Sequence, residues 1–198
     1  MTSSEKALRS QRLNQITHEP HSELDTLVKA HAPFETRANF ARFVVAQYLF
    51  QSELVELYND AELIRIVPDL PARCRADAAK ADLADLDTEV PGPVAGAVKN
   101  PSKARALGWI FVSEGSKLGA AFLIKRAVAL ELSETFGARH LGEPEGGRAE
   151  GWKRFVRTLD SLQFSAEEEA EVEQGALDAF NRFTVLLEQA YATEAEMA

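Results

Sequence analysis

The sequence predicts a single-domain, all-α protein. Apolar residues recur at helical spacing along almost the whole chain, and no run alternates in the manner of a β-strand. The chain has 198 residues, of which 45% are hydrophobic, so one domain with a substantial core is expected. We assign this domain to residues 1–192 and expect a disordered tail over 193–198.

Two helices are predicted in the first third of the chain. The earlier one begins with Thr17 as its N-cap and tolerates Pro20 in its first turn. Its apolar side carries Leu24, Leu27, Val28 and His31. The later helix has a stripe that faces a core and comprises Phe40, Phe43, Val44, Gln47, Phe50, Leu54 and Leu57.

Further helices are expected over 72–86, 102–132, 149–162 and 165–191. The 102–132 segment is too long for an ordinary straight helix, so we expect it to bend near its glycines. Ser165 and Glu168 form a capping-box pattern at the start of the last helix. Loops are expected over 90–101, which holds three prolines and two glycines, and over the glycine-rich 136–147.

Composition excludes several classes of protein. The net charge is −9 and no basic tract is present, which argues against a nucleic-acid binder. The one cysteine, Cys74, fits a reducing compartment and is expected to pack, partly buried, in a helix. We find neither a signal peptide nor a window apolar enough to cross a bilayer, so we expect a cytoplasmic protein with no membrane contact.

The segment from Ser113 to Ala121 is unusual because Gly115 and Gly119 lie one helical turn apart within a strong helix-forming stretch. Each glycine costs a helix interior about 1 kcal/mol relative to alanine. Close packing of a second helix is one explanation. The other is that something flat, or bulky, approaches the bare backbone.

The four histidines do not form a metal cluster in the sequence. No glutamate lies three residues before any of them, which disfavours a di-iron bundle, and zinc spacing is absent. His21, however, falls on the apolar side of its helix, in line with Leu24 and Val28. Such a histidine is either a satisfied core residue or a ligand to haem iron. Asp25, one turn later, could hold its second ring nitrogen.

Several motifs together resemble a bacterial haem oxygenase of the iron-starvation type found in pseudomonads. The similarity covers nearly the whole chain and rests on Asn14, Thr17–His21, Asn39–Phe43, Gln47–Phe50, Leu107–Gly119, Phe136–Leu141 and Ala179–Phe183. It implies haem held between a proximal helix and a glycine-kinked distal helix. It also implies conversion of haem to biliverdin, CO and Fe²⁺, with O₂ and with electrons from an NAD(P)H-dependent reductase or a ferredoxin, in the service of iron acquisition.

The resemblance also implies roles for individual residues. His21 corresponds to the iron ligand, and Gly115, Ser116 and Gly119 correspond to the catalytic distal bend. Residues expected to bind the cofactor, with cations near the propionates or the pocket rim, are Lys29, Arg75, Arg126, Asn14, Phe111, Phe183 and Asp25. Haem would be both substrate and cofactor. The oligomeric state stays open, a monomer included.

Three positions depart from family patterns. Ser116 stands where the animal enzymes carry an aspartate, which favours a water network for oxygen activation. Asp25 stands where glutamate is common, and Arg126 where the pseudomonad enzymes usually carry lysine. The subgroup includes enzymes that open the haem ring at the β and δ meso carbons rather than at α. By resemblance, Asn14, Lys29 and Phe111 weakly favour β and δ opening in this protein.

Two alternatives belong to other classes. A haem storage or trafficking protein could have the same pocket without turnover. A helical protein of the related thiaminase-like fold would hold a small cation among acidic side chains. The context of Cys74 and the apolar placement of His21 oppose the second alternative.

Overall fold

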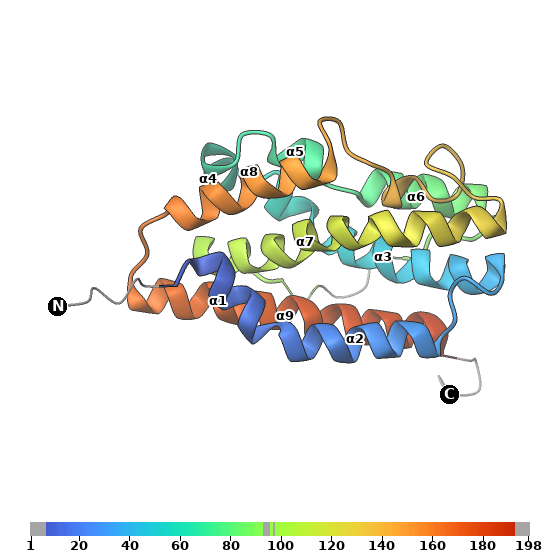
Figure 1. Ribbon diagram of the computed structural model, residues 1–198, viewed down its shortest axis with the longest axis horizontal. Coiled ribbons are helices and arrows are strands. Elements are labelled where there is room, and N and C mark those ends of the chain that lie inside the picture. The colour runs from blue at the N-terminus through green and yellow to red at the C-terminus, as the bar shows by residue number, and fades with distance from the viewer. Residues whose placement is uncertain (1–6, 93–95, 97, 193–198) are drawn as a thin grey trace.

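The computed structural model describes residues 7–92, 96 and 98–192, so the predicted tail over 193–198 lies outside the described residues. The regular structure in the described part is helical (Figure 1). Its α-helices are α1 (Arg9–Ile16), α2 (His18–Ala30), α3 (Arg37–Tyr58), α4 (Ala61–Ile66), α5 (Leu70–Arg73), α6 (Ala76–Asp85), α7 (Lys103–Ala127), α8 (Arg148–Ser161) and α9 (Ala166–Tyr191). Two 3₁₀ turns, η1 (Val128–Leu130) and η2 (Arg139–Leu141), follow α7. The all-α prediction is confirmed.

Helix α7 runs through the middle of the bundle. It packs most extensively on α9, and α3 and α8 also contact it. Figure 1 shows α1, α2 and α9 on one side of α7 and α4, α5, α6 and α8 on the other. Because α2 packs mainly on α9, a space can remain between α2 and α7.

The core is built from the apolar stripes of α3, α7 and α9. Phe40 is completely buried, and Phe50 packs edge-on against Phe183 with ring centroids 5.5 Å apart. The ring of Phe50 also stacks on Trp109 at 6.2 Å. Aromatic pairs of this geometry add stability beyond the area they bury. The stripe predicted on α3 therefore faces the core as expected.

Helix α7 is shorter than predicted. It begins at Lys103, where the hydroxyl of Ser102 accepts a bond from the Arg105 amide, and it passes into the turn η1 at Val128. Helical structure is unbroken across Gly115 and Gly119.

The expectation that no segment could cross a membrane is corrected. Residues 103–130 are long and apolar enough by composition, with a hydropathy of 1.3 over the most apolar window. Of that window, 44% is buried inside the bundle, where α7 packs on α9, α8 and α3. A central core helix has the same composition as a membrane span, so this segment is weak evidence for one.

Two glycines outside the singled-out segment, Gly108 and Gly175, lie where α7 and α9 pack closely. A Cβ on Gly108 of α7 would collide with the Val172 carbonyl oxygen of α9, and a Cβ on Gly175 would collide with the Arg105 carbonyl oxygen of α7. Both collisions are with backbone atoms, which cannot move away by a change of side-chain rotamer. Close crossing of two helices therefore explains this pair of glycines.

We expect Gly175→Ala to lower the free energy of unfolding by up to about 2 kcal/mol. Overpacking costs about 1–3 kcal/mol, and alanine returns about 1 kcal/mol of helix propensity. The matched control is Gly151→Ala on α8, where the added Cβ would reach only the Arg73 guanidinium at 4.0 Å. Urea unfolding of the apo protein measures both, and equal stability of the two variants would contradict the crossing.

Several local predictions differ from the structure. The predicted helix over 72–86 is split into α5 and α6, and Cys74, in extended conformation, lies half-buried at the break. Helices α1 and α4 were not predicted because each is too short for a clear periodicity. Thr17 does not cap α2, since its hydroxyl donates back to the Leu13 carbonyl at 2.7 Å. The capping box at α9 is confirmed, with Ser165 and Glu168 bonding each other's backbone amides.

Candidate functional site

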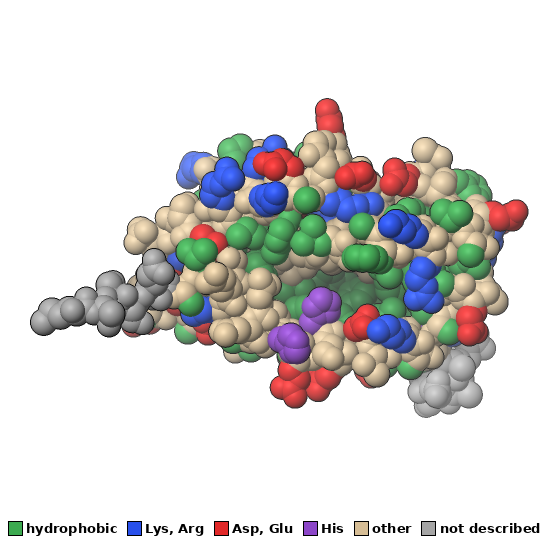
Figure 2. Space-filling view, in the orientation of Figure 1, with side chains coloured by type: hydrophobic (Ala, Val, Ile, Leu, Met, Phe, Trp, Pro, Cys, Tyr) green, Lys and Arg blue, Asp and Glu red, His purple; other side chains and the backbone are tan. Residues whose placement is uncertain are grey.

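Helix α2 is amphipathic, yet none of its residues is fully buried. Its apolar side chains Leu24, Leu27 and Val28 are only half-covered. Figure 2 shows the reason: a hollow lined by hydrophobic side chains opens between α2 and α7, with histidine side chains at its edge. A helix whose apolar side faces a hollow of this kind is suited to cover one side of a flat apolar ligand.

His21 is the ring on α2 best placed to act as a ligand. It lies in the second turn of α2 and is exposed. Its ring is tilted by 38° against that of Phe180 on α9, with centroids 5.7 Å apart. Phe180 therefore supports one side of the imidazole and leaves the rest open. The sequence placed His21 on the apolar side of the helix, and the structure shows that this side is not closed over it.

The Asp25 carboxylate pairs with Lys29 in the structure, and its suggested bond to His21 stays a prediction. Its carboxylate accepts a bond from the Lys29 ammonium at 2.6 Å, and both side chains are exposed, by 57% and 68%. His21 and Lys29 each lie one turn from Asp25, so the carboxylate can turn either way. A full positive charge attracts it more strongly than a neutral imidazole, and the order acid-then-base favours the pair.

The glycine segment of α7 presents bare backbone. A Cβ on Gly119 would find no atom within 4 Å, so no neighbouring helix requires this glycine. A Cβ on Gly115 would touch the Trp152 ring of α8 at 3.5 Å, an ordinary contact. Close helix packing therefore does not explain either position, and Gly119 opens onto free space.

Ser116 is exposed but its hydroxyl is turned into its own helix. The oxygen donates to the Ser113 carbonyl at 2.7 Å. Such back-bonding is common for serine within a helix. This side of α7 thus offers a small polar surface without a carboxylate or imidazole.

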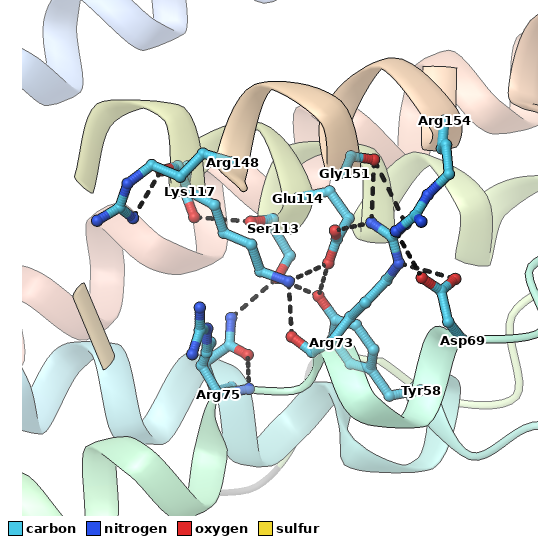
Figure 3. Close-up of polar contacts among 12 residues, drawn as sticks. Tyr58, Asp69, Arg73, Arg75, Ser113, Glu114, Lys117, Arg148, Gly151 and Arg154 are labelled. Carbon is cyan, nitrogen blue, oxygen red and sulfur yellow. Dashed lines mark hydrogen bonds and ion pairs between the residues drawn. The ribbon is translucent and has the colours of Figure 1, made fainter. Parts of the chain in front are cut away.

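The three predicted cations divide into two groups. Lys29 on α2 and Arg126 near the end of α7 are exposed, and the Arg126 guanidinium lies 4.5 Å from the centre of the Phe34 ring. Arg75 lies elsewhere: it precedes α6, donates to the Gly142 carbonyl at 2.9 Å and stands near Arg148 (Figure 3). Burial, and then the charge of Arg148, lower the pKa of Arg75. The structure does not bring Arg75 together with the other two.

The three remaining predicted contacts differ in burial. Asn14 is exposed on α1, whereas Phe111 and Phe183 are 4% and 8% exposed. The Phe111 ring packs on Trp152, with centroids 5.3 Å apart. Both phenylalanines are therefore primarily core residues on α7 and α9.

Two residues near the glycines were missed. Trp152 forms the wall beside Gly115, and no sequence pattern links the two positions because they lie on different helices. Phe122 is 72% exposed and follows Gly115 and Gly119 at i+7 and i+3, so it shares their side of α7. That spacing was readable in the sequence.

The fold and the hollow suit one class of protein: a helical protein with room for a flat apolar group between a histidine-bearing helix and a bare-backbone helix. The family model for heme oxygenase matches residues 8–189. The chain therefore belongs to the heme oxygenase family.

Two relatives agree with this assignment. The chain is 59% identical to heme oxygenase PigA of Pseudomonas aeruginosa over 191 residues, which is 96% of each chain. It also superimposes on the NO- and CO-bound heme oxygenase of Neisseria meningitidis with a TM-score of 0.87, 36% identity and 98% coverage of both chains. The protein is thus a haem-degrading oxidoreductase for which haem is the substrate.

Proposed function

We propose that haem lies in the hollow between α2 and α7, with His21 bound to its iron and Gly119 facing the opposite side. The free space at Gly119 carries this proposal, because a strong helix former would otherwise be expected in mid-helix. The exposed His21 ring supplies a second support, since it belongs to α2, which borders the hollow on the other side.

The chain contributes position more than acid–base groups. Haem itself supplies the O₂ chemistry once bound. Phe180 holds the His21 ring from the side, and Gly119 leaves room for O₂. Because the Ser116 hydroxyl is engaged by its own helix, ordered water is the proton carrier at this side. Phe111 and Phe183 support the walls from the core, and Asn14 lies in the last turn of α1, which leads into α2.

Lys29 and Arg126 are proposed to bind the haem propionates. The protein carries a net charge of −9, so two entering carboxylates need local cations. Within the described residues, Arg126 has no carboxylate partner and Lys29 has only the exposed Asp25. In this arrangement Asp25 offsets part of the charge of Lys29. Arg75, bonded to Gly142, is left out of this set.

The remaining partners follow from the reaction class. Ring opening consumes O₂ and electrons, which an NAD(P)H-dependent reductase or a ferredoxin would supply in the cytoplasm. The products would be biliverdin, CO and Fe²⁺, so the physiological role we propose is acquisition of iron from haem.

The test is an absorption spectrum of the protein with added hemin, followed by addition of reductant under O₂. We expect a His-ligated ferric spectrum, then loss of the Soret band with appearance of bilin and CO. A stable haem complex without bilin would indicate storage or trafficking. Absence of a haem complex would overturn the proposed haem-binding site.

We expect Lys29→Ala combined with Arg126→Ala to change the ratio of biliverdin isomers more than haem affinity. Exposed ion pairs are worth about 1 kcal/mol or less each, so loss of two of them should lower affinity by about thirtyfold or less. Without its anchors the macrocycle can reseat, which exposes a different meso carbon. Chromatography of the products gives the ratio.

The matched control is Lys80→Ala combined with Lys153→Ala, which removes the same charge from exposed sites on α6 and α8. It should keep the wild-type ratio. If both double variants give the wild-type ratio, the propionate assignment is wrong.

A further inference from the structure

Behind the glycine segment, α7 carries a buried polar cluster that the proposed function does not use. We call it the Glu114 cluster; its members are Gln51, Tyr58, Arg73, Ser113, Glu114 and Lys117 (Figure 3). Glu114 is 3% exposed and Ser113 is completely buried. Buried charges and hydroxyls are costly unless each has a partner, and this cluster satisfies them mutually.

The Glu114 carboxylate is the common acceptor of the cluster. Its Oε1 accepts from the Tyr58 hydroxyl at 2.9 Å and from the Lys117 ammonium at 2.6 Å. Its Oε2 accepts from the Arg73 guanidinium at 2.7 Å. Both oxygens are thus engaged, and the three donors come from α3, α5 and α7.

The hydrogen bonds point in one direction. Because the single Tyr58 proton goes to Glu114, the Ser113 hydroxyl donates to Tyr58 at 2.7 Å, and Gln51 donates to Ser113 at 2.9 Å. The Gln51 carbonyl in turn accepts from the Arg75 amide at 3.0 Å. This polar chain therefore runs from the start of α6 through α3 and ends on the carboxylate of α7. Bonds in series polarise one another, so loss of one member weakens the rest.

Burial and charge keep these groups in the states that the chain requires. Burial, and then the charge of Glu114, raise the pKa of Tyr58 well above its usual value, so the hydroxyl stays protonated and donates. Burial lowers the pKa of Lys117, and the adjoining Glu114 opposes that effect. The Lys117 ammonium also donates to the Arg73 carbonyl at 2.6 Å. Helix α7 is thereby bound to the end of α5 by side chain and backbone together.

The cluster and the glycine face lie on opposite sides of one short stretch of α7. At 100° per residue, Ser113, Glu114 and Lys117 share one side. The mean direction of Gly115, Ser116 and Gly119 lies about 160° around the helix from the mean direction of the first three. Burial agrees, since the first three residues are buried or half-buried whereas Ser116 and Gly119 are exposed. A change in rotation or height of α7 at the cluster is therefore transferred directly to the backbone at Gly119.

We propose that Glu114 is a positioning residue, which together with Tyr58 fixes the rotation and height of α7 over haem and thereby helps to select the meso carbon that is opened. This inference rests on the proposed haem-binding site between α2 and α7. Apolar contacts at this point would hold the helices together but would allow sliding, whereas directional bonds to both carboxylate oxygens permit one arrangement.

The primary test compares Glu114→Gln with Tyr58→Phe. An amide nitrogen cannot accept from Arg73, Lys117 or Tyr58, so Glu114→Gln must lose one side of the cluster. A misplacement of about 1 Å can cost about a hundredfold in rate. We expect turnover to fall about tenfold or more and the biliverdin isomer ratio to change. Tyr58→Phe is the milder variant; it removes one link of the polar chain and should shift the same ratio in the same direction.

The matched control is Glu53→Gln. Glu53 lies on α3 and is likewise a buried carboxylate, 7% exposed and ion-paired to Arg182 of α9. Its loss should reduce stability without touching the glycine face. Hydrogen exchange of the apo proteins gives a readout independent of turnover: amides around Gly115 and Gly119 should exchange faster in Glu114→Gln and Tyr58→Phe but not in Glu53→Gln.

Each outcome is decisive. A wild-type isomer ratio and wild-type exchange in Glu114→Gln would overturn the positioning role, as would equal shifts in Glu53→Gln. A hemin spectrum of each variant distinguishes an error in the positioning role from an error in the proposed haem-binding site. If only the positioning role is wrong, the His-ligated spectrum persists. If the wild-type protein itself lacks that spectrum, the proposed haem site between α2 and α7 is wrong.

Discussion

His21→Ala should abolish the His-ligated ferric spectrum and lower turnover by at least about a hundredfold. Loss of merely an outer partner of a metal ligand costs about 10–100-fold, so loss of the ligand itself should cost more. The fold should survive, because His21 is exposed and the substitution removes one ring contact, with Phe180. Absorption spectra with hemin and bilin yield under reductant and O₂ are the measurements.

The same helix offers a matched control. His18 is also exposed and lies three residues earlier, so His18→Ala removes an imidazole from the same region without removing the proposed ligand. It should keep the wild-type spectrum. Added imidazole should partly restore ligation in His21→Ala, since the vacated space can hold it. A wild-type spectrum in His21→Ala, or loss of ligation in His18→Ala, would refute the assignment.

The long helices were predictable because their signals are local. The Ser165–Glu168 capping box marks the start of α9, and the apolar stripe of α3 repeats over many turns. Helix α5 is four residues long, which is less than two turns and gives no period to recognise. The end of α7 at Ala127 was also missed, because no glycine or proline marks it. Boundaries of this kind depend on tertiary contacts.

The candidate site was predictable where one residue type carries the chemistry. His21 and Gly119 stood out from the sequence because imidazole and missing side chains have few substitutes. The role of Asp25 stays a prediction, and the sequence did not show that Lys29 competes with His21 for its carboxylate. The glycines at the close crossing, Gly108 and Gly175, were not recognised as a pair, since they meet only when α7 and α9 cross.

The Glu114 cluster illustrates the same limit. Glu114 and Lys117 read as an ordinary pair on the surface of a helix, which sequence alone would place in solvent. In the structure the Glu114 side chain is 2% exposed, and the cation that completes its shell is Arg73, which precedes it by 41 residues. Only the packing of α5 against α7 converts a common charge pattern into a buried site.

Gly119→Leu should have two effects of opposite sign. Leucine is a better helix former than glycine by about 0.8 kcal/mol, and a Cβ at this position meets no atom within 4 Å. The apo protein should therefore unfold at a higher urea concentration than the wild type. Haem or O₂ binding should nevertheless fall, because the new side chain fills the space that the proposed function reserves for them. Turnover should fall with it.

Gly119→Ala provides the graded comparison. Its single methyl group should raise apo stability by about 1 kcal/mol while reducing haem or O₂ affinity less than leucine does. Urea unfolding and hemin titration of the two variants separate the explanations for this glycine. If Gly119 served helix packing, both substitutions would destabilise the apo protein, as Gly175→Ala is expected to do. If it serves the haem slot, stability and ligand affinity must move in opposite directions, and leucine must cost more affinity than alanine.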